Sequence, residues 1–361
     1  MMSMFVETVV LDCIDTFRAE RTVNAIYYLI TGKKSAQTIQ DVVWFRLHRY
    51  YNILPGFDKN AFFTLLHKME RQDQIVIEKE IARITAQGKN IYKKYREKYP
   101  WPDSFDGYRF QHIDEQFWKR LSLAVQVLSH WSYNKTRFIP VQKEPEIQQE
   151  VKHWLFAAGK RYSKEEIAVL FYEELLRLLQ LVEEYDLAPE LIVYRLTGYK
   201  KAGLTFRQLA QKMHLDEDYC QVLFRAFLHQ VISLLWKRSD SFPLLASLVQ
   251  DLHQPLILTR SSARTLELLR MGKTITDIAR IRKLRPGTVQ DHVVEIAFMD
   301  PQFSIDPFVR PELQEKINAA VSKSNSRKLR QIKELVTEAD YFSIRLVLAS
   351  RMKTKTFQDS W

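Results

Sequence analysis

Residues 261–298 read SSARTLELLRMGKTITDIARIRKLRPGTVQDHVVEIAF, and this stretch decides how the C-terminal part of the chain folds. Its capping and breaking residues predict three short helices. Ser262 is a suitable cap for the first helix, and Gly272 ends it. Thr274 suits the cap of the second helix, and Pro286 suits the first position of the third. Apolar residues recur at helical spacing in all three segments, so each helix has one inward face.

Three helices in this order form a helix-turn-helix. Ala279 is small enough for two helices to cross closely, and Val289 lies inside the third helix. In such a unit the third helix lies in the major groove of DNA while the second crosses the backbone. Four basic residues that we expect to contact phosphates crowd the end of the second helix and the turn: Arg280, Arg282, Lys283 and Arg285. Thr288 and Gln290 would face the groove. The alternative is a three-helix cluster that binds protein.

Composition favours a helical, basic protein. The chain has 361 residues, of which 46% are hydrophobic and only nine are glycine, so we expect an all-α, multi-helical fold. The net charge is +11, which makes nucleic acid the first partner to consider. From Pro255 to the end there are 19 Lys and Arg against 12 Asp and Glu, a net of +7. The alternative is a solvated basic surface with no ligand.

Several site classes find no support. The cysteines, Cys13 and Cys220, are far apart and fit buried thiols better than a disulfide or zinc site. The histidines show no metal-ligand spacing, so we expect neither a metal nor another cofactor. With no long apolar run and no signal peptide, we expect no membrane association and a cytoplasmic, nucleoid-associated protein.

The rest of the chain divides into three predicted domains. These are an N-terminal helical domain at 1–135, a middle helical domain at 145–252 and the C-terminal helix-turn-helix domain at 258–350. The proline-bounded segment 133–145 is the candidate linker between the first two domains.

Within the N-terminal domain, we expect two helices over residues 5–30 and a third that Thr38 opens. Residues 74–77 fit a short wing strand, so this domain resembles a helix-turn-helix with or without a wing. A long charged helix over 78–99 and another over 113–131 should follow.

In the middle domain, helices are expected over 145–156, over 187–196 and over 242–258. Ser163 and Glu166 have the spacing of a capping box and should open a strong amphipathic helix.

An internal similarity links the three parts. Residues 28–39 and 194–206 each combine a helix, a Thr-Gly stop, two lysines and a second helix with a threonine at its start. Residues 271–275 repeat the Gly-Lys-Thr part of this plan. The chain therefore carries up to three helix-turn-helix-like units, through either true repetition or convergent capping.

The sequence lacks a recognisable enzyme site. Residues 198–204 have the glycine spacing of a phosphate-binding loop, but Leu204 stands where lysine is required. At 272–274 the Gly-Lys-Thr end is present without the first glycine. We therefore expect a protein that is not an enzyme. Aromatic and basic residues alternate over 92–101, which suits single-strand binding, but we favour an aromatic core with outward lysines.

The stretch 261–350 resembles the helix-turn-helix domain at the C-terminus of some RecQ-type DNA helicases. The residues that carry this resemblance are Thr265, Leu268, Leu269, Gly272, Lys273, Thr274, Ile275, Ile278, Ala279, Arg282, Thr288, Val289 and His292, with residues 344–349 further on. Lys283 departs from the glycine common in such turns. The chain as a whole resembles the YpbB family of Bacillus-type bacteria, whose gene typically lies beside one for a RecQ-type helicase.

The resemblance implies a DNA-binding accessory protein that works with a RecQ-type helicase in recombination or repair. The helicase would hydrolyse ATP, and this chain would hold DNA mainly through phosphates. Asp291 argues against strong base reading, because a carboxylate repels phosphate and can pair only with a cytosine amino group. Two alternatives stay open: a helix-turn-helix transcriptional regulator, and a helical protein–protein adaptor.

Overall fold

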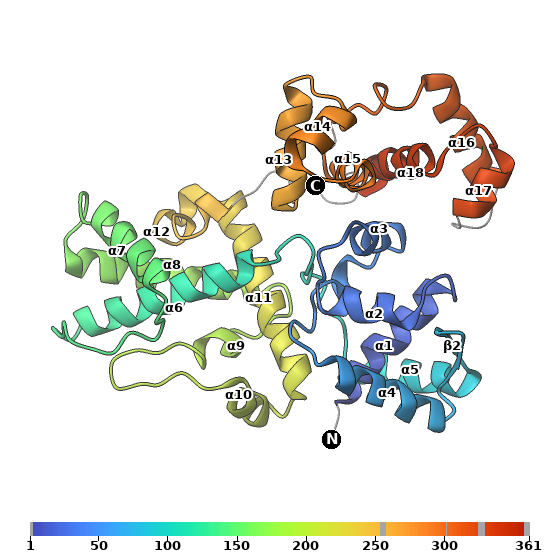
Figure 1. Cartoon of the computed structure of the whole chain (residues 1–361). Helices are drawn as coiled ribbons and strands as arrows, with labels where there is room; N and C mark the ends of the chain where they lie inside the picture. The colour runs from blue at the N-terminus through green and yellow to red at the C-terminus, as the bar shows by residue number, and fades with distance from the viewer. Residues whose placement is uncertain (1–2, 253–257, 301, 324–328, 357–361) are drawn as a thin grey trace. The chain divides into compact units, whose positions relative to one another are not determined.

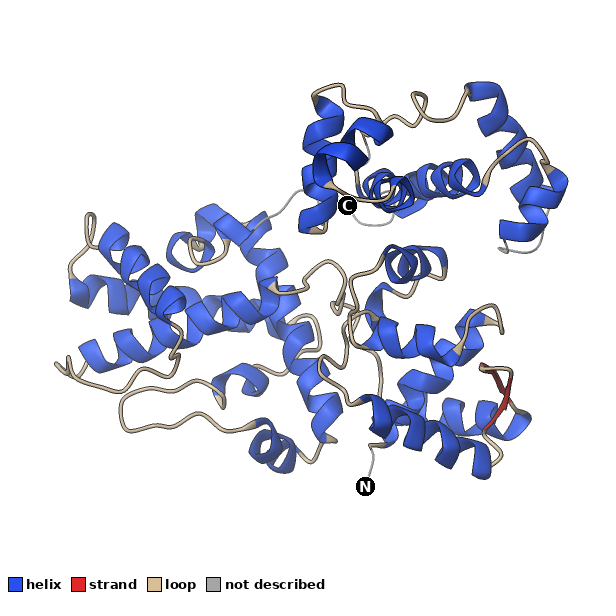
Figure 2. Cartoon of the chain, viewed as in Figure 1, coloured by secondary structure: helices blue, strands red, loops and turns tan. Residues whose placement is uncertain are grey.

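The computed structural model describes residues 3–252, 258–300, 302–323 and 329–356, and this part of the chain is mostly helical (Figure 1; Figure 2). It contains eighteen α-helices and one two-stranded sheet. The predicted helical fold is confirmed, and the all-α class is corrected by the small sheet. Contacts group the chain into a first unit, residues 1–15 and 49–254, and a second unit, residues 16–48 and 255–361.

The first unit contains most of the helices and the sheet. Its elements are α1 (Met4–Phe17, whose last two residues group with the second unit), α4 (Lys59–Arg71), β1 (Ile75–Glu78), β2 (Ile81–Ile84), α5 (Ala86–Lys98), α6 (Ile113–Trp131), α7 (Pro145–Ala158), α8 (Lys164–Glu183), α9 (Glu190–Val193), α10 (Phe206–Met213), α11 (Glu217–Lys237) and α12 (Pro243–Ala246), with 3-10 turns at His48–Tyr50, Ser239–Ser241 and Gln250–Leu252.

The second unit combines two early helices with the C-terminal ones. Its elements are α2 (Val23–Ile30), α3 (Ala36–Trp44), α13 (Arg260–Arg270), α14 (Ile275–Arg282), α15 (Pro286–Met299), α16 (Pro311–Lys323), α17 (Leu329–Leu335) and α18 (Tyr341–Thr356). Residues 16–48 lie inside the predicted N-terminal domain 1–135, yet they group with the C-terminal helices. The three-domain division itself stays a prediction.

Buried polar contacts hold α6 and α11 together in the first unit. The Asp114 carboxylate accepts from Nε of Arg225 at 2.7 Å and lies 3.1 Å from Nε2 of His229. The His229 ring also stacks on Phe110, 4.4 Å between centroids. A buried carboxylate needs such partners, because an unpaired charge in a low-dielectric interior is strongly destabilising.

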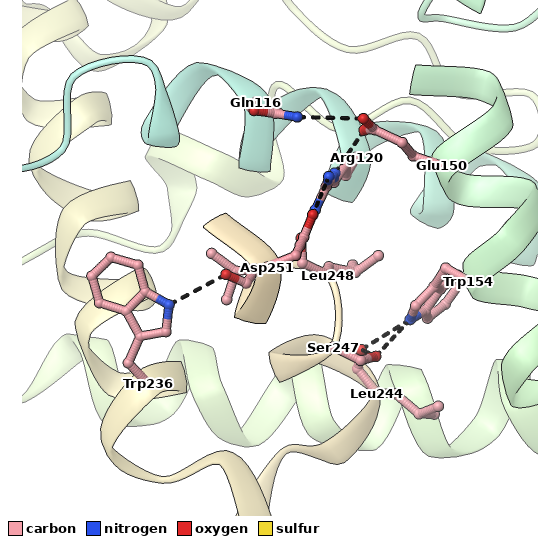
Figure 3. Close-up of polar contacts among 10 residues, drawn as sticks. Gln116, Arg120, Glu150, Trp154, Trp236, Leu244, Ser247, Leu248 and Asp251 are labelled. Carbon is pink, nitrogen blue, oxygen red and sulfur yellow. Dashed lines mark hydrogen bonds and ion pairs between the residues drawn. The ribbon is translucent and has the colours of Figure 1, made fainter. Parts of the chain in front are cut away.

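A second polar cluster ties α6 to α7 and to the segment after α12 (Figure 3). Arg120 donates to both carboxylate oxygens of Asp251, at 2.6 and 2.8 Å, and to Glu150 at 2.8 Å. Nearby, the Trp154 ring nitrogen donates to Leu244 O and to Ser247 Oγ. The bidentate Arg120–Asp251 pair fixes both distance and orientation, since the guanidinium fork matches a carboxylate.

The predicted wing strand is confirmed, and the long helix over 78–99 is wrong at its beginning. Strands β1 and β2 pair antiparallel, with Ile75 opposite Ile84. Lys79 and Glu80 make the turn, both at positive φ (49° and 64°). Two-residue hairpin turns require positive φ at both central residues. The β-branched residues on either side of the turn favour strands. Helix α5 begins only after Thr85, whose Oγ1 accepts from Gly88 N.

The aromatic segment 92–101 packs into the first unit. Tyr99 is buried, and its ring lies edge-on to Phe5 and Tyr219. Trp101 stacks on Phe5 at 6.2 Å between centroids and meets Tyr50 edge-on. These contacts support the aromatic-core interpretation over the single-strand platform.

Three further expectations need correction. Ser35, not Thr38, opens α3, since its Oγ accepts from Thr38 N. The helix expected over 187–196 covers only Glu190–Val193, and Gly198 lies beyond it in a tight turn paired with Lys201. The helix expected over 242–258 is the single turn α12 followed by a 3-10 turn, and residues 253–257 lie outside the described part. Prolines at 243 and 255 limit continuous helix there.

Other predictions are confirmed. Helix α6 spans 113–131 as expected, and Ser163 forms a full capping box with Glu166 at the start of α8. Cys13 and Cys220 are both fully buried free thiols. Among the described helices, none combines the length and the hydrophobicity needed to cross a lipid bilayer.

Candidate nucleic-acid interface

Local signals set the ends of α13, α14 and α15. Thr274 and Asp277 form a reciprocal capping box at the start of α14. As predicted, α13 ends just before Gly272, which has a positive φ of 75°. Pro286 occupies the first turn of α15, also as predicted. The cap of α13 is Thr259, not Ser262: Thr259 Oγ1 accepts from Ser262 N at 3.1 Å.

Lys283, which departs from the glycine common in such turns, forms the turn between α14 and α15. It has φ 53° and ψ 42°, the left-handed conformation, and ends α14. Leu284 N then donates to Ala279 O at 2.9 Å, which closes a Schellman-type cap. The left-handed conformation is sterically unfavourable for lysine. The turn nevertheless has the backbone geometry of a glycine turn, and it places a positive charge at its tip.

A small apolar core joins the three helices. It consists of the buried side chains of Leu268, Ile278, Ala279 and Val289, with Leu269, Ile275 and Leu284 packed against them. Each of the three helices and the turn thus contributes at least one side chain to this core. The core fixes the angle between α14 and α15, which is what a helix-turn-helix needs to present its turn and third helix together.

A buried carboxylate ties the start of α13 to α15. Glu295 accepts from Thr259 N at 2.6 Å and from Ser262 Oγ at 2.6 Å. Burial raises the pKa of Glu295, although these hydrogen bonds act in the opposite direction. Ser262 is therefore a buried partner of Glu295, which explains why it is not the cap.

Arg282 has a structural role. Its Nη1 donates to Ser261 O at 2.8 Å and to Thr265 Oγ1 at 2.5 Å, and its Nη2 donates to Ser261 Oγ at 2.8 Å. Thr265 Oγ1 in turn lies 2.9 Å from Nδ1 of His292. Burial and the nearby Arg282 charge lower the pKa of His292. The half-buried guanidinium thus braces α14 against α13 and α15.

The third helix is mostly covered. Residues 292–299 of α15 are all buried, and α15 packs against α13, α14, α18 and α3 (Figure 1). Only residues within its first six positions reach the surface: Pro286 and Gly287 are exposed, and Thr288, Gln290 and Asp291 are half-buried. Asp291 beside them accepts from Nη2 of Arg345 on α18 at 2.7 Å. Base contacts are therefore restricted to the N-terminal end of α15.

The structure brings together most of the predicted DNA-contact residues. Lys283 and Arg285 are exposed on either side of the turn, and Arg280 is exposed one turn earlier, with 77% of its side chain accessible and an ion pair to Asp277. Arg282 differs from these because its guanidinium is engaged internally. We call Arg280, Lys283, Arg285 and the exposed Gly287 the turn surface. Sequence reasoning missed Gly287, whose missing side chain leaves the helix N-terminus open.

The middle part of the chain contains the same turn with the opposite charge. Thr205 forms a capping box with Gln208 at the start of α10, and His214 ends that helix at φ 55°. Leu215 N donates to Ala210 O at 2.9 Å, the same bond as Leu284 to Ala279. However, Asp216 caps α11, and this helix begins with Glu217 and Asp218. The turn before α11 is therefore followed by acidic residues, whereas the C-terminal turn is basic. Whether the units are true repeats stays a prediction.

Comparisons with known proteins agree with this geometry. The profile of a family described as a helix-turn-helix domain matches residues 261–348. Protein YpbB of Bacillus subtilis (strain 168) is 32% identical over 353 residues, which are 97% of this chain and 98% of that protein. No solved structure matches the chain.

Proposed function

Because the chain belongs to the YpbB family and carries a helix-turn-helix domain at residues 261–348, we propose that it binds DNA as a non-enzymatic accessory protein. Its partner in this proposal is a RecQ-type helicase acting in recombination or repair, and its place is the bacterial nucleoid in the cytoplasm. The observation that carries the DNA-binding part is the turn surface, where Lys283 and Arg285 are exposed just before α15 and Arg280 is exposed one turn earlier on α14.

Phosphate contact suits this surface better than base reading. A helix N-terminus carries unpaired backbone N–H groups and a partial positive charge, so it binds anions. Gly287 has nothing within 4 Å of the position a Cβ would take, so a phosphate can approach the backbone there. Lys283 and Arg285 add full charges beside it. Thr288 and Gln290 are the residues left for the groove, and Asp291 is already paired with Arg345.

Arg282 enters the proposal as a positioning residue. Its bonds to Ser261 and Thr265 hold α14 in place, and α14 carries Arg280 and leads into the turn. The helicase partnership rests on the resemblance of residues 261–350 to the C-terminal domain of RecQ-type helicases, and it is tested separately from DNA binding.

Two measurements test the two parts. Titration of forked, single-stranded and duplex DNA at two salt concentrations should give tight, strongly salt-dependent binding to DNA that contains a duplex, with little dependence on sequence. Preference for one duplex sequence would indicate a transcriptional regulator instead. In a pull-down, the tagged full chain should retain purified RecQ-type helicase after nuclease treatment. Failure to retain it would contradict the partnership and leave DNA binding unaffected.

A further inference from the structure

We propose that a groove beside the start of α14 holds an unpaired nucleobase next to the bound duplex. The groove lies within the second unit and has a volume of about 860 Å³. It is bordered by the end of α13, the start of α14, the loop before α16 and the start of α18. This volume falls within the range of roughly 300–1,000 Å³ typical of small-ligand sites. The proposal rests on the proposed function, because the base belongs to DNA held by the turn surface.

Aromatic rings form one wall of the groove. Phe303 and Phe308 stack with 6.0 Å between centroids, and Phe308 meets Phe342 edge-on at 6.3 Å. All three are half-buried and line the groove, so part of each ring faces the open space. Nucleobases stack on such rings whatever their sequence, because every base has a π-face.

The opposite rim is cationic and polar. Arg270, with 66% of its side chain exposed, and the exposed Lys273 border the groove where α13 ends. Arg270 forms a loose ion pair with Asp300, 3.8 Å between Nη2 and Oδ2, so its charge is partly balanced, and the exposed Lys273 adds a second cation. Thr276 and Gln302 add a hydroxyl and an amide group that can meet the edge of a base, whereas the Ser304 hydroxyl donates to Asp306.

The position of the groove relative to the turn surface fits a strand that leaves a duplex. Helix α14 has eight residues, and the groove lies at its start while Lys283 lies at its end. At 1.5 Å per residue this separation is about 12 Å, or roughly three to four base steps of B-DNA. A strand whose duplex is held at the turn surface therefore needs only a short unpaired extension to reach the rings.

A protein side chain is the competing occupant of such a groove. The combination of stacking rings with Arg270 and Lys273 favours the nucleotide, because a nucleotide brings both a π-face and a phosphate. An apolar peptide would use the rings alone and would not engage the exposed Lys273.

The experiment compares a blunt duplex with the same duplex carrying a single-stranded thymidine overhang of about six nucleotides, by fluorescence anisotropy with the full chain. We expect the wild type to bind the overhang duplex about tenfold more tightly, the usual gain from one base stacked on an aromatic ring. Phe308→Leu keeps apolar bulk but removes the stacking ring, so it should lose most of this preference and keep its affinity for the blunt duplex. Lys273→Met should reduce the preference in part.

Phe156→Leu is the matched control, since Phe156 is 70% exposed on α7 and lies outside the groove; it should keep the preference. Equal affinity of the wild type for both DNAs, or an unchanged preference in Phe308→Leu, would overturn the nucleotide site. Loss of helicase retention by Phe308→Leu without any overhang preference would assign the groove to protein. Failure of the wild type to bind even the blunt duplex would instead refute the proposed function.

Discussion

Arg282→Met should loosen the helix-turn-helix without removing a DNA contact. The guanidinium donates three hydrogen bonds across the unit, to Ser261 O, Ser261 Oγ and Thr265 Oγ1. Methionine keeps much of the apolar stem and removes all three bonds. The structure therefore predicts that α13 and α14 lose their mutual brace while the turn surface keeps its charges.

The size of this effect follows from the type of bond. A buried hydrogen bond to a charged group contributes roughly 1.5–3 kcal/mol, and the half-exposure of Arg282 reduces the sum. We expect a loss of about 2 kcal/mol in the local opening free energy, which corresponds to roughly thirtyfold faster amide exchange in α13 and α14.

Hydrogen exchange followed by mass spectrometry on the full chain measures this directly. Arg280→Met is the matched control, because Arg280 lies on the same helix with an exposed side chain and a surface ion pair to Asp277; it should leave exchange unchanged. DNA binding supplies a second measurement. If Arg282→Met left exchange at the wild-type rate and lowered the salt dependence of DNA binding by about one phosphate contact, Arg282 would be a phosphate ligand and the brace would be refuted.

Three further predictions concern the same unit. Ile278→Ala removes a fully buried side chain of the small core and should destabilise the unit by about 2–5 kcal/mol in a denaturant titration, whereas Ile281→Ala, 54% exposed on the same helix, should have little effect. Lys283→Gly relieves a left-handed lysine, so it should stabilise the unit by about 1 kcal/mol while weakening DNA binding through the lost charge; unchanged stability would contradict the turn geometry. Burial raises the pKa of Glu295 in the folded protein above that of an ordinary glutamate. The contribution of its carboxyl to stability therefore falls as the pH rises from the ordinary pKa of glutamate through the raised pKa. Glu295→Gln lacks this titration, so its deficit in melting temperature relative to wild type should be larger near about pH 4 than near about pH 7.

Sequence patterns predicted the elements whose signals are local. The capping box at Ser163, the cap at Thr274 and the proline at 286 lie where the structure has helix starts. Each depends on hydrogen bonds or backbone limits within one helical turn. The same reasoning placed the cap of α13 at Ser262, but Thr259 is the cap and the Ser262 hydroxyl donates to the buried Glu295, a contact between distant parts of the chain.

Features that depend on distant parts of the chain were not predictable from patterns. The charge pattern of residues 78–99 suits a helix, but residues 81–84 pair with residues 75–78 and form the strand β2. Arg282 belongs to a basic run in sequence, yet its partners on α13 take it out of the turn surface. The packing of α18 and α3 against α15 leaves accessible residues of α15 only within 286–291, and no periodicity within α15 indicates which neighbours cover it.

The salt dependence of duplex binding tests most directly whether the turn surface holds DNA phosphates. Each phosphate contact contributes about 0.9 to the slope of log affinity against log salt. Lys283→Gln with Arg285→Gln should therefore reduce the slope by roughly 1.8 and weaken binding to all duplex sequences alike. The control, Lys152→Gln with Lys160→Gln, changes two exposed lysines of the first unit and should leave the slope unchanged. An unchanged slope in the Lys283 and Arg285 variant would contradict the account.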